Sequence, residues 1–170
     1  MITLVLGGAR SGKSAVAERL VSQFPGPVTY VATASVDRSD PDHVDRIERH
    51  RARRDPAWGT VEADTDLAHV LATASGTVLV DSLGTWVTRW ADLAVEVEPL
   101  VRALLRRAGD TVLVSEEVGL GVHPATELGR RFRDVMGTVN TTVAAASDRV
   151  LLVVAGRVLA PIDRITAVAR

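Results

Sequence analysis

The chain has 170 residues, the usual size of one compact domain, and we expect a single domain over residues 1–170. Its 20 basic and 21 acidic residues leave a net charge of -1, which excludes an overall positive field for nonspecific binding to nucleic acid. The absence of cysteine excludes disulfides, thiolate metal sites and cysteine nucleophiles. With no leader-like start and no stretch of about 20 apolar residues, we expect a cytoplasmic protein without a membrane span.

The predicted elements alternate between strands and helices along the chain. A strand at 2–6, a glycine loop and a helix at 15–21 come first, then a strand at 28–32 and a charged helix from Asp40 to about Arg54. Later come a helix at 67–74, a strand at 77–80, helices from about 84 and at 99–108, a strand at 111–115, a helix at 125–146 and a strand at 150–155. Residues 155–159 resemble a hairpin that can add an antiparallel edge strand. This α/β alternation predicts a mostly parallel sheet with helices on both faces.

The loop after the first strand matches the complete Walker A pattern of phosphate-binding proteins. It consists of Gly7, Gly8, Ala9, Arg10, Ser11, Gly12, Lys13 and Ser14. Backbone N–H groups of such a loop bind phosphate oxygens, Lys13 would reach the β and γ phosphates, and the Ser14 hydroxyl would ligate Mg²⁺. The alternative is a glycine turn with an exposed lysine, but the flanking strand and helix favour the phosphate site. Lys13 is the only lysine in the sequence.

Carboxylates follow two of the predicted strands. Asp81 ends the strand at 77–80, where a carboxylate beside a phosphate loop can support Mg²⁺, although Asp81 or Ser82 could instead cap a helix. Glu116 and Glu117 end the strand at 111–115, at the sheet edge where α/β proteins bind ligands. Either glutamate could also cap a helix or face water, so the sequence leaves their roles open.

One histidine lies within a cluster of arginines. His50 is surrounded by Arg46, Arg49, Arg51, Arg53 and Arg54 on the predicted charged helix. The simplest interpretation is a solvated helix face. Guanidinium groups at this density could also bind a polyphosphate, and a neutral imidazole among them could attack phosphorus.

Together these motifs resemble the bifunctional adenosylcobinamide kinase / adenosylcobinamide-phosphate guanylyltransferase family of cobalamin biosynthesis. The similarity runs nearly end to end. The matching residues are 7–14, Tyr30 to Ser35, Arg46 and Ile47 with His50 and Arg51, the spaced Trp58, Thr60 and Glu62, Glu117 to Gly121 with Pro124, Arg131 to Asp134, Val139 with Asn140, and Ala144 to Ala146. The loop alone is common to many P-loop proteins, but the ordered set is specific.

The resemblance implies a RecA-like P-loop NTPase fold, a homotrimer and two reactions. ATP or GTP phosphorylates adenosylcobinamide, and GMP from GTP is then transferred to adenosylcobinamide phosphate through a guanylyl-histidine, which matches His50. The other matching nucleotide contacts are Thr33, Ala34, Ser35, Arg51, Ala52, Arg53, Arg54, Glu62 and Asp81, with Ser14 and Asp81 at Mg²⁺.

Three positions depart from the family pattern. Leu6 stands where relatives often have a small hydroxyl residue, Arg49 where some have a second histidine, and Asp81 where a glutamate also occurs. Two other functions stay open. One is a small-molecule kinase without a covalent histidine, and the other is a GTP-gated binding or regulatory protein.

Overall fold

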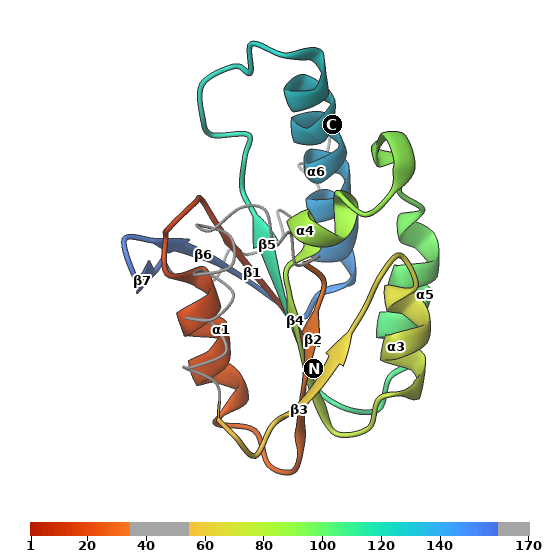
Figure 1. Ribbon diagram of the computed structural model, residues 1–170. Helices are drawn as coiled ribbons and strands as arrows, with labels where there is room; N and C mark the ends of the chain where they lie inside the picture. The colour runs from red at the N-terminus through yellow and green to blue at the C-terminus, as the bar shows by residue number, and fades with distance from the viewer. Residues whose placement is uncertain (35–54, 160–170) are drawn as a thin grey trace, which may run out of the picture.

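The computed structural model describes residues 1–34 and 55–159, which form a seven-stranded sheet flanked by helices (Figure 1). The strands are β1 (Ile2–Gly7), β2 (Val28–Ala32), β3 (Gly59–Glu62), β4 (Thr77–Asp81), β5 (Thr111–Glu116), β6 (Arg149–Val154) and β7 (Arg157–Val158). The helices are α1 (Lys13–Val21), α3 (Leu67–Thr73), α4 (Leu83–Val87), η1 (Ala91–Leu93), α5 (Val97–Arg106) and α6 (Glu127–Ala146). The sheet order is β3-β2-β4-β5-β1-β6-β7, and only the β6–β7 pair among these strands is antiparallel.

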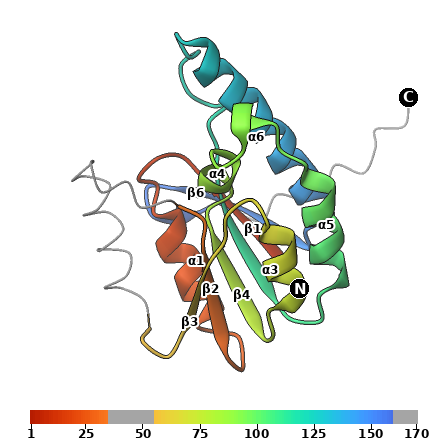
Figure 2. The same cartoon turned by 45° about the vertical axis from the view of Figure 1, so that its right-hand side comes forward.

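The central strands are buried on both faces, which explains their continuous apolar sequences. On β1, Val5 packs in the cluster that contains Val16 and Val21 of α1, whereas Leu4 packs in the cluster that contains Leu100 of α5. In Figure 1, α1 lies on one side of the sheet and α3, α5 and α6 lie on the other, and Figure 2 shows the same separation. Two apolar layers, one on each face, therefore stabilise the sheet.

The structure confirms the predicted fold class, a mostly parallel P-loop α/β sheet with helices on both faces. The antiparallel edge strand expected within 155–159 is present as β7, and β2 has the predicted bounds. The charged helix expected from Asp40 to about Arg54 falls outside the described residues. No helix in the described ranges is both long enough and apolar enough to cross a membrane.

The edge strand β3 was not expected. Its sequence, Gly-Thr-Val-Glu, contains no apolar run, and all four residues are exposed. Its strand character comes from parallel pairing with β2, in which Ala32 is the partner of Glu62. Because β2 also pairs with β4, Glu62, Ala32 and Asp81 lie in register at the carboxyl edge of the sheet.

Candidate active site

The phosphate loop connects β1 to α1 and has a conformation that depends on glycine. Gly12 has φ 91° at the start of α1, in the left-handed region that favours glycine. A Cβ on Gly7 would lie 2.8 Å from the Val153 carbonyl oxygen, too close for any other residue. The Gly156 amide donates a hydrogen bond of 2.7 Å to the Ser11 carbonyl, so the turn between β6 and β7 supports the loop.

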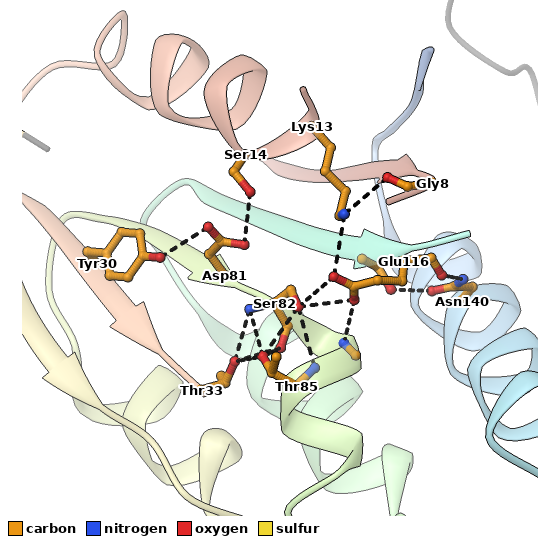
Figure 3. Close-up of polar contacts among 12 residues, drawn as sticks. Gly8, Lys13, Ser14, Tyr30, Thr33, Asp81, Ser82, Thr85, Glu116 and Asn140 are labelled. Atoms are coloured by element: carbon orange, nitrogen blue, oxygen red, sulfur yellow. Dashed lines mark hydrogen bonds and ion pairs between the residues drawn. The ribbon is translucent and has the colours of Figure 1, made fainter. Parts of the chain in front are cut away.

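The Lys13 side chain lies across this loop and contacts a carboxylate. Its ammonium donates to the Gly8 carbonyl oxygen at 3.3 Å and forms an ion pair of 3.5 Å with Glu116 (Figure 3). The side chain is only 11% exposed. A positive charge is thus held at the position from which a P-loop lysine reaches phosphates.

Asp81 lies beside the start of α1, between two hydroxyl groups. Its Oδ1 accepts a hydrogen bond of 3.2 Å from Ser14, and its Oδ2 accepts one of 3.0 Å from the Tyr30 hydroxyl (Figure 3). The Ser14 hydroxyl and a carboxylate are hard oxygen donors, and Mg²⁺ at phosphate sites needs only one or two carboxylates in addition to phosphates and water. This donor set fits Mg²⁺, even though the described ranges contain no cluster of three or more His, Cys, Asp or Glu side chains that could hold a metal.

The helix that follows Asp81 is capped by its neighbour. Ser82 is the N-cap of α4 and forms a capping box with Thr85. Of the two residues that the sequence suggested as caps, Ser82 takes this position. The Asp81 carboxylate does not cap the helix and instead accepts hydrogen bonds from Ser14 and Tyr30.

Thr33 is 1% exposed and connects β2 to the start of α4. Its hydroxyl donates to the Ser82 carbonyl oxygen at 2.7 Å and accepts from the Ser82 amide at 2.9 Å. These contacts give Thr33 a part in shaping the edge of the site. Direct contact of Thr33 or the half-buried Ala34 with nucleotide stays a prediction.

The two glutamates after β5 have different surroundings. The Glu116 carboxylate accepts hydrogen bonds of 2.9 Å from the Ser82 hydroxyl and 2.9 Å from the Gly84 amide, in addition to its ion pair with Lys13. Glu117 accepts a hydrogen bond of 2.8 Å from the Gly119 amide within its own loop. A Cβ on Gly84 would lie 2.7 Å from the Glu116 carboxylate carbon, so the glycine makes room for this contact.

The described residues thus bring together the phosphate loop, Lys13, Ser14, Asp81 and Glu116. Glu62 ends β3, two strands away from Asp81, and is exposed. Ser35, His50, Arg51, Ala52, Arg53 and Arg54 lie outside the described residues. Two residues at the site were given no role from the sequence. Tyr30 was noted only as part of the matching stretch Tyr30 to Ser35, and Gly84 looks like an ordinary glycine at a helix start.

Comparisons with known proteins give a consistent result. A family model described as cobinamide kinase / cobinamide phosphate guanyltransferase matches residues 3–160. The chain is 42% identical over 165 residues to the bifunctional adenosylcobalamin biosynthesis protein CobP of Pseudomonas aeruginosa, covering 92% of this chain and 94% of that protein. It is 37% identical over 178 residues to the bifunctional adenosylcobalamin biosynthesis protein CobU of Escherichia coli, covering 92% of this chain and 97% of that protein.

Among solved structures, the P4 protein from bacteriophage phi6 in complex with ADP aligns with a TM-score of 0.43 and 17% sequence identity. The alignment covers 92% of this chain and 52% of that protein, so the chain spans about half of its length.

Proposed function

The chain belongs to the cobinamide kinase / cobinamide phosphate guanyltransferase family, and we propose that it catalyses both reactions on adenosylcobinamide. The first reaction phosphorylates the substrate hydroxyl with ATP or GTP. The second transfers GMP from GTP to the new phosphate and gives adenosylcobinamide-GDP. The observation that carries this proposal is the phosphate loop with Lys13, next to the paired Ser14 and Asp81.

In the kinase step, the loop amides and Lys13 bind the nucleotide phosphates. The substrate hydroxyl oxygen attacks the γ-phosphorus and its proton passes to water, the bond to the bridging oxygen breaks, and a nucleoside diphosphate leaves. Ser14 and Asp81 would hold Mg²⁺, which neutralises phosphate charge when bound. Lys13 exchanges its ion pair with Glu116 for contacts to phosphate, and this fixes the γ-phosphoryl group for attack.

In the guanylyltransfer step, we assign the nucleophile to His50 because it matches the family's guanylyl-histidine. A ring nitrogen attacks the α-phosphorus of GTP, a P–N bond forms, and pyrophosphate leaves. An oxygen of the substrate phosphate then attacks the same phosphorus and releases His50. Arg51, Arg53 and Arg54 supply positive charge for the phosphates at this stage, and Ser35 and Ala52 match further nucleotide contacts.

The family resemblance also supports GTP as the guanylyl donor, Mg²⁺ as the metal, a homotrimer and a cytoplasmic location. It supports Thr33, Ala34 and Glu62 as nucleotide contacts. The small-molecule kinase and the GTP-gated binding protein both share the phosphate loop. Neither of these alternative functions requires His50, so a substitution of His50 distinguishes them from the proposed bifunctional enzyme.

The test measures the two reactions separately on one purified protein. Phosphorylation is measured as the transfer of label from γ-labelled GTP to adenosylcobinamide. Guanylyltransfer is measured as the transfer of label from α-labelled GTP to chemically prepared adenosylcobinamide phosphate. Lys13→Ala should lower both rates by about 100-fold or more, because it removes a charge aimed at phosphate. His50→Ala should abolish guanylyltransfer and keep phosphorylation, whereas the control His69→Ala, on the exposed face of α3, should change neither rate. Guanylyltransfer that survives in His50→Ala would contradict the proposed mechanism.

A further inference from the structure

Tyr30 and Asp81 lie on neighbouring strands and on the same face of the sheet. In the parallel pairing of β2 with β4, Tyr30 is the partner of Leu79 and Ala32 is the partner of Asp81. Side chains two residues apart on a strand share a face, so Tyr30 and Asp81 are diagonal neighbours beneath α1. This relation lets the tyrosine ring extend along the sheet towards the site.

The Tyr30 ring is part of the core, while its hydroxyl belongs to the site. The residue is 2% exposed and packs in the cluster that contains Val16 and Ala17 of α1 and Leu79 of β4. Close packing restricts the rotation of such a ring. Its hydroxyl donates a hydrogen bond of 3.0 Å to Asp81 Oδ2 (Figure 3). The core therefore fixes the position of this donor.

The two oxygens of the Asp81 carboxylate have separate partners. Ser14 donates to Oδ1 at 3.2 Å, and Tyr30 donates to Oδ2 at 3.0 Å. A hydrogen bond to one oxygen limits rotation of the carboxylate and leaves the other oxygen directed at the start of α1. Outer partners of this kind orient metal ligands and usually change metal affinity when they are removed.

We propose that Tyr30 is a positioning residue for the Mg²⁺–nucleotide site and acts through Asp81. The inference rests on the proposed metal role of Ser14 and Asp81. The Tyr30 hydroxyl holds the Asp81 carboxylate in one orientation next to Ser14.

Tyr30→Phe tests the inference because it removes the hydroxyl and keeps the packed ring. Metal binding is measured directly by titrating Mn²⁺ into the protein in the presence of a non-hydrolysable GTP analogue. The electron paramagnetic resonance signal gives the concentration of Mn²⁺ that stays free. We expect Mn²⁺ to bind about 10-fold more weakly to Tyr30→Phe than to the unaltered chain. Binding of the analogue in EDTA, where no metal takes part, should change by less than about two-fold.

Two further variants make the result decisive. Thr111→Val also removes a buried hydroxyl, at the amino end of β5, that accepts a 3.0 Å hydrogen bond from Arg107. This control variant should bind Mn²⁺ with unchanged affinity. Asp81→Asn should weaken Mn²⁺ binding, and Tyr30→Phe should add nothing in that background if it acts through Asp81. Thermal unfolding of each variant without metal checks that it is folded.

The outcomes separate this inference from the proposed function. If Asp81→Asn weakens Mn²⁺ binding but Tyr30→Phe does not, the role of Tyr30 is wrong and the metal site stands. An equal loss in Thr111→Val would show a general effect of stability and would also overturn the role of Tyr30. Unchanged Mn²⁺ affinity in Asp81→Asn would overturn the metal site together with this inference.

Discussion

The Glu116 carboxylate lies 3.5 Å from the Lys13 ammonium, at the position where a P-loop lysine meets phosphate. The same carboxylate accepts hydrogen bonds from the Ser82 hydroxyl and the Gly84 amide, so it is held by the start of α4. With Lys13 in its proposed role, a bound polyphosphate would compete with Glu116 for this positive charge.

Removal of the Glu116 charge should tighten nucleotide binding. In Glu116→Gln the side chain keeps an oxygen acceptor for Ser82 and Gly84 but no longer repels phosphate or pairs with Lys13. Across a partly exposed site this difference is about 1 kcal/mol, which corresponds to about a five-fold lower Kd for GTP. Titration with a fluorescent GTP analogue measures the change. Glu117→Gln is the matched control and should leave the Kd unchanged, and weaker binding in Glu116→Gln would contradict the competition.

A side chain at Gly84 should destabilise the fold through Glu116. The Cβ of Gly84→Ala would lie 2.7 Å from the Glu116 carboxylate carbon, so the carboxylate would have to move away and lose its hydrogen bonds to Ser82 and the Gly84 amide, at a cost of about 1–2 kcal/mol of unfolding free energy. Urea denaturation measures this cost. Gly137→Ala is the control, because the added Cβ on α6 has no neighbour within 4 Å and should stabilise the helix by up to about 1 kcal/mol.

The cost of Gly84→Ala should also depend on its neighbour. Glu116→Ala removes the carboxylate that the new methyl group would meet, so the two substitutions together should cost less than the sum of their separate effects. Additive costs would show that the strain at Gly84 has another source.

Lys13 should be protected from amine-reactive reagents by nucleotide. It is the only lysine in the sequence, and the terminal amino group, which pairs with Asp110 at 2.9 Å, provides an internal reference in the same molecule. Acetylation followed by peptide mass analysis should show Lys13 reacting about 10-fold more slowly with saturating Mg²⁺–GTP, because phosphate contacts occupy its ammonium. The rate at the terminal amino group should not change. Equal rates at Lys13 with and without nucleotide would contradict its assigned contact.

Arg107 should stabilise the end of the sheet opposite the site without affecting function. Its guanidinium donates to the carbonyl oxygens of Leu71, Ala74 and Gly76, at 3.0, 2.6 and 2.5 Å. Burial lowers the pKa of Arg107 from its usual value, and Asp110 acts in the opposite direction. Arg107→Leu leaves the three carbonyl groups without this donor and should lower the unfolding free energy by about 2–4 kcal/mol.

The neighbouring arginine gives the matched control for this loss. Arg106→Leu, at an exposed position of α5, should change the unfolding free energy by less than about 0.5 kcal/mol. Both variants should bind GTP like the unaltered chain. Weaker GTP binding in Arg107→Leu would show that this end of the sheet influences the site.

The sequence was sufficient for the parts of the fold that have a strong local pattern. The buried β4 and β5 and the amphipathic α5 and α6 were predicted because apolar periodicity and burial coincide. The exposed β3 was missed because its structure comes from pairing with β2 and not from its own residues.

At the site, too, residues of one contiguous motif could be predicted from the sequence, whereas contacts between distant segments could not. Lys13 and Ser14 belong to a contiguous motif, so their proximity is encoded locally. The contact of Glu116 with Lys13 depends on two strands that are adjacent in space and more than a hundred residues apart in sequence. The approach of Tyr30 to Asp81 depends on the register between β2 and β4, which the sequence does not specify locally.

The most direct test of the proposed function is the intact mass of the protein after incubation with GTP, Mg²⁺ and pyrophosphatase. The sample is kept at neutral or alkaline pH, since acid hydrolyses a phosphoramidate, and the unaltered chain is compared with His50→Ala and His69→Ala. A covalent guanylyl-histidine at His50 predicts a mass gain of one GMP in the unaltered chain and in His69→Ala, and none in His50→Ala. A folded, GTP-binding protein that gains no mass, or a gain that persists in His50→Ala, would contradict the assignment of His50.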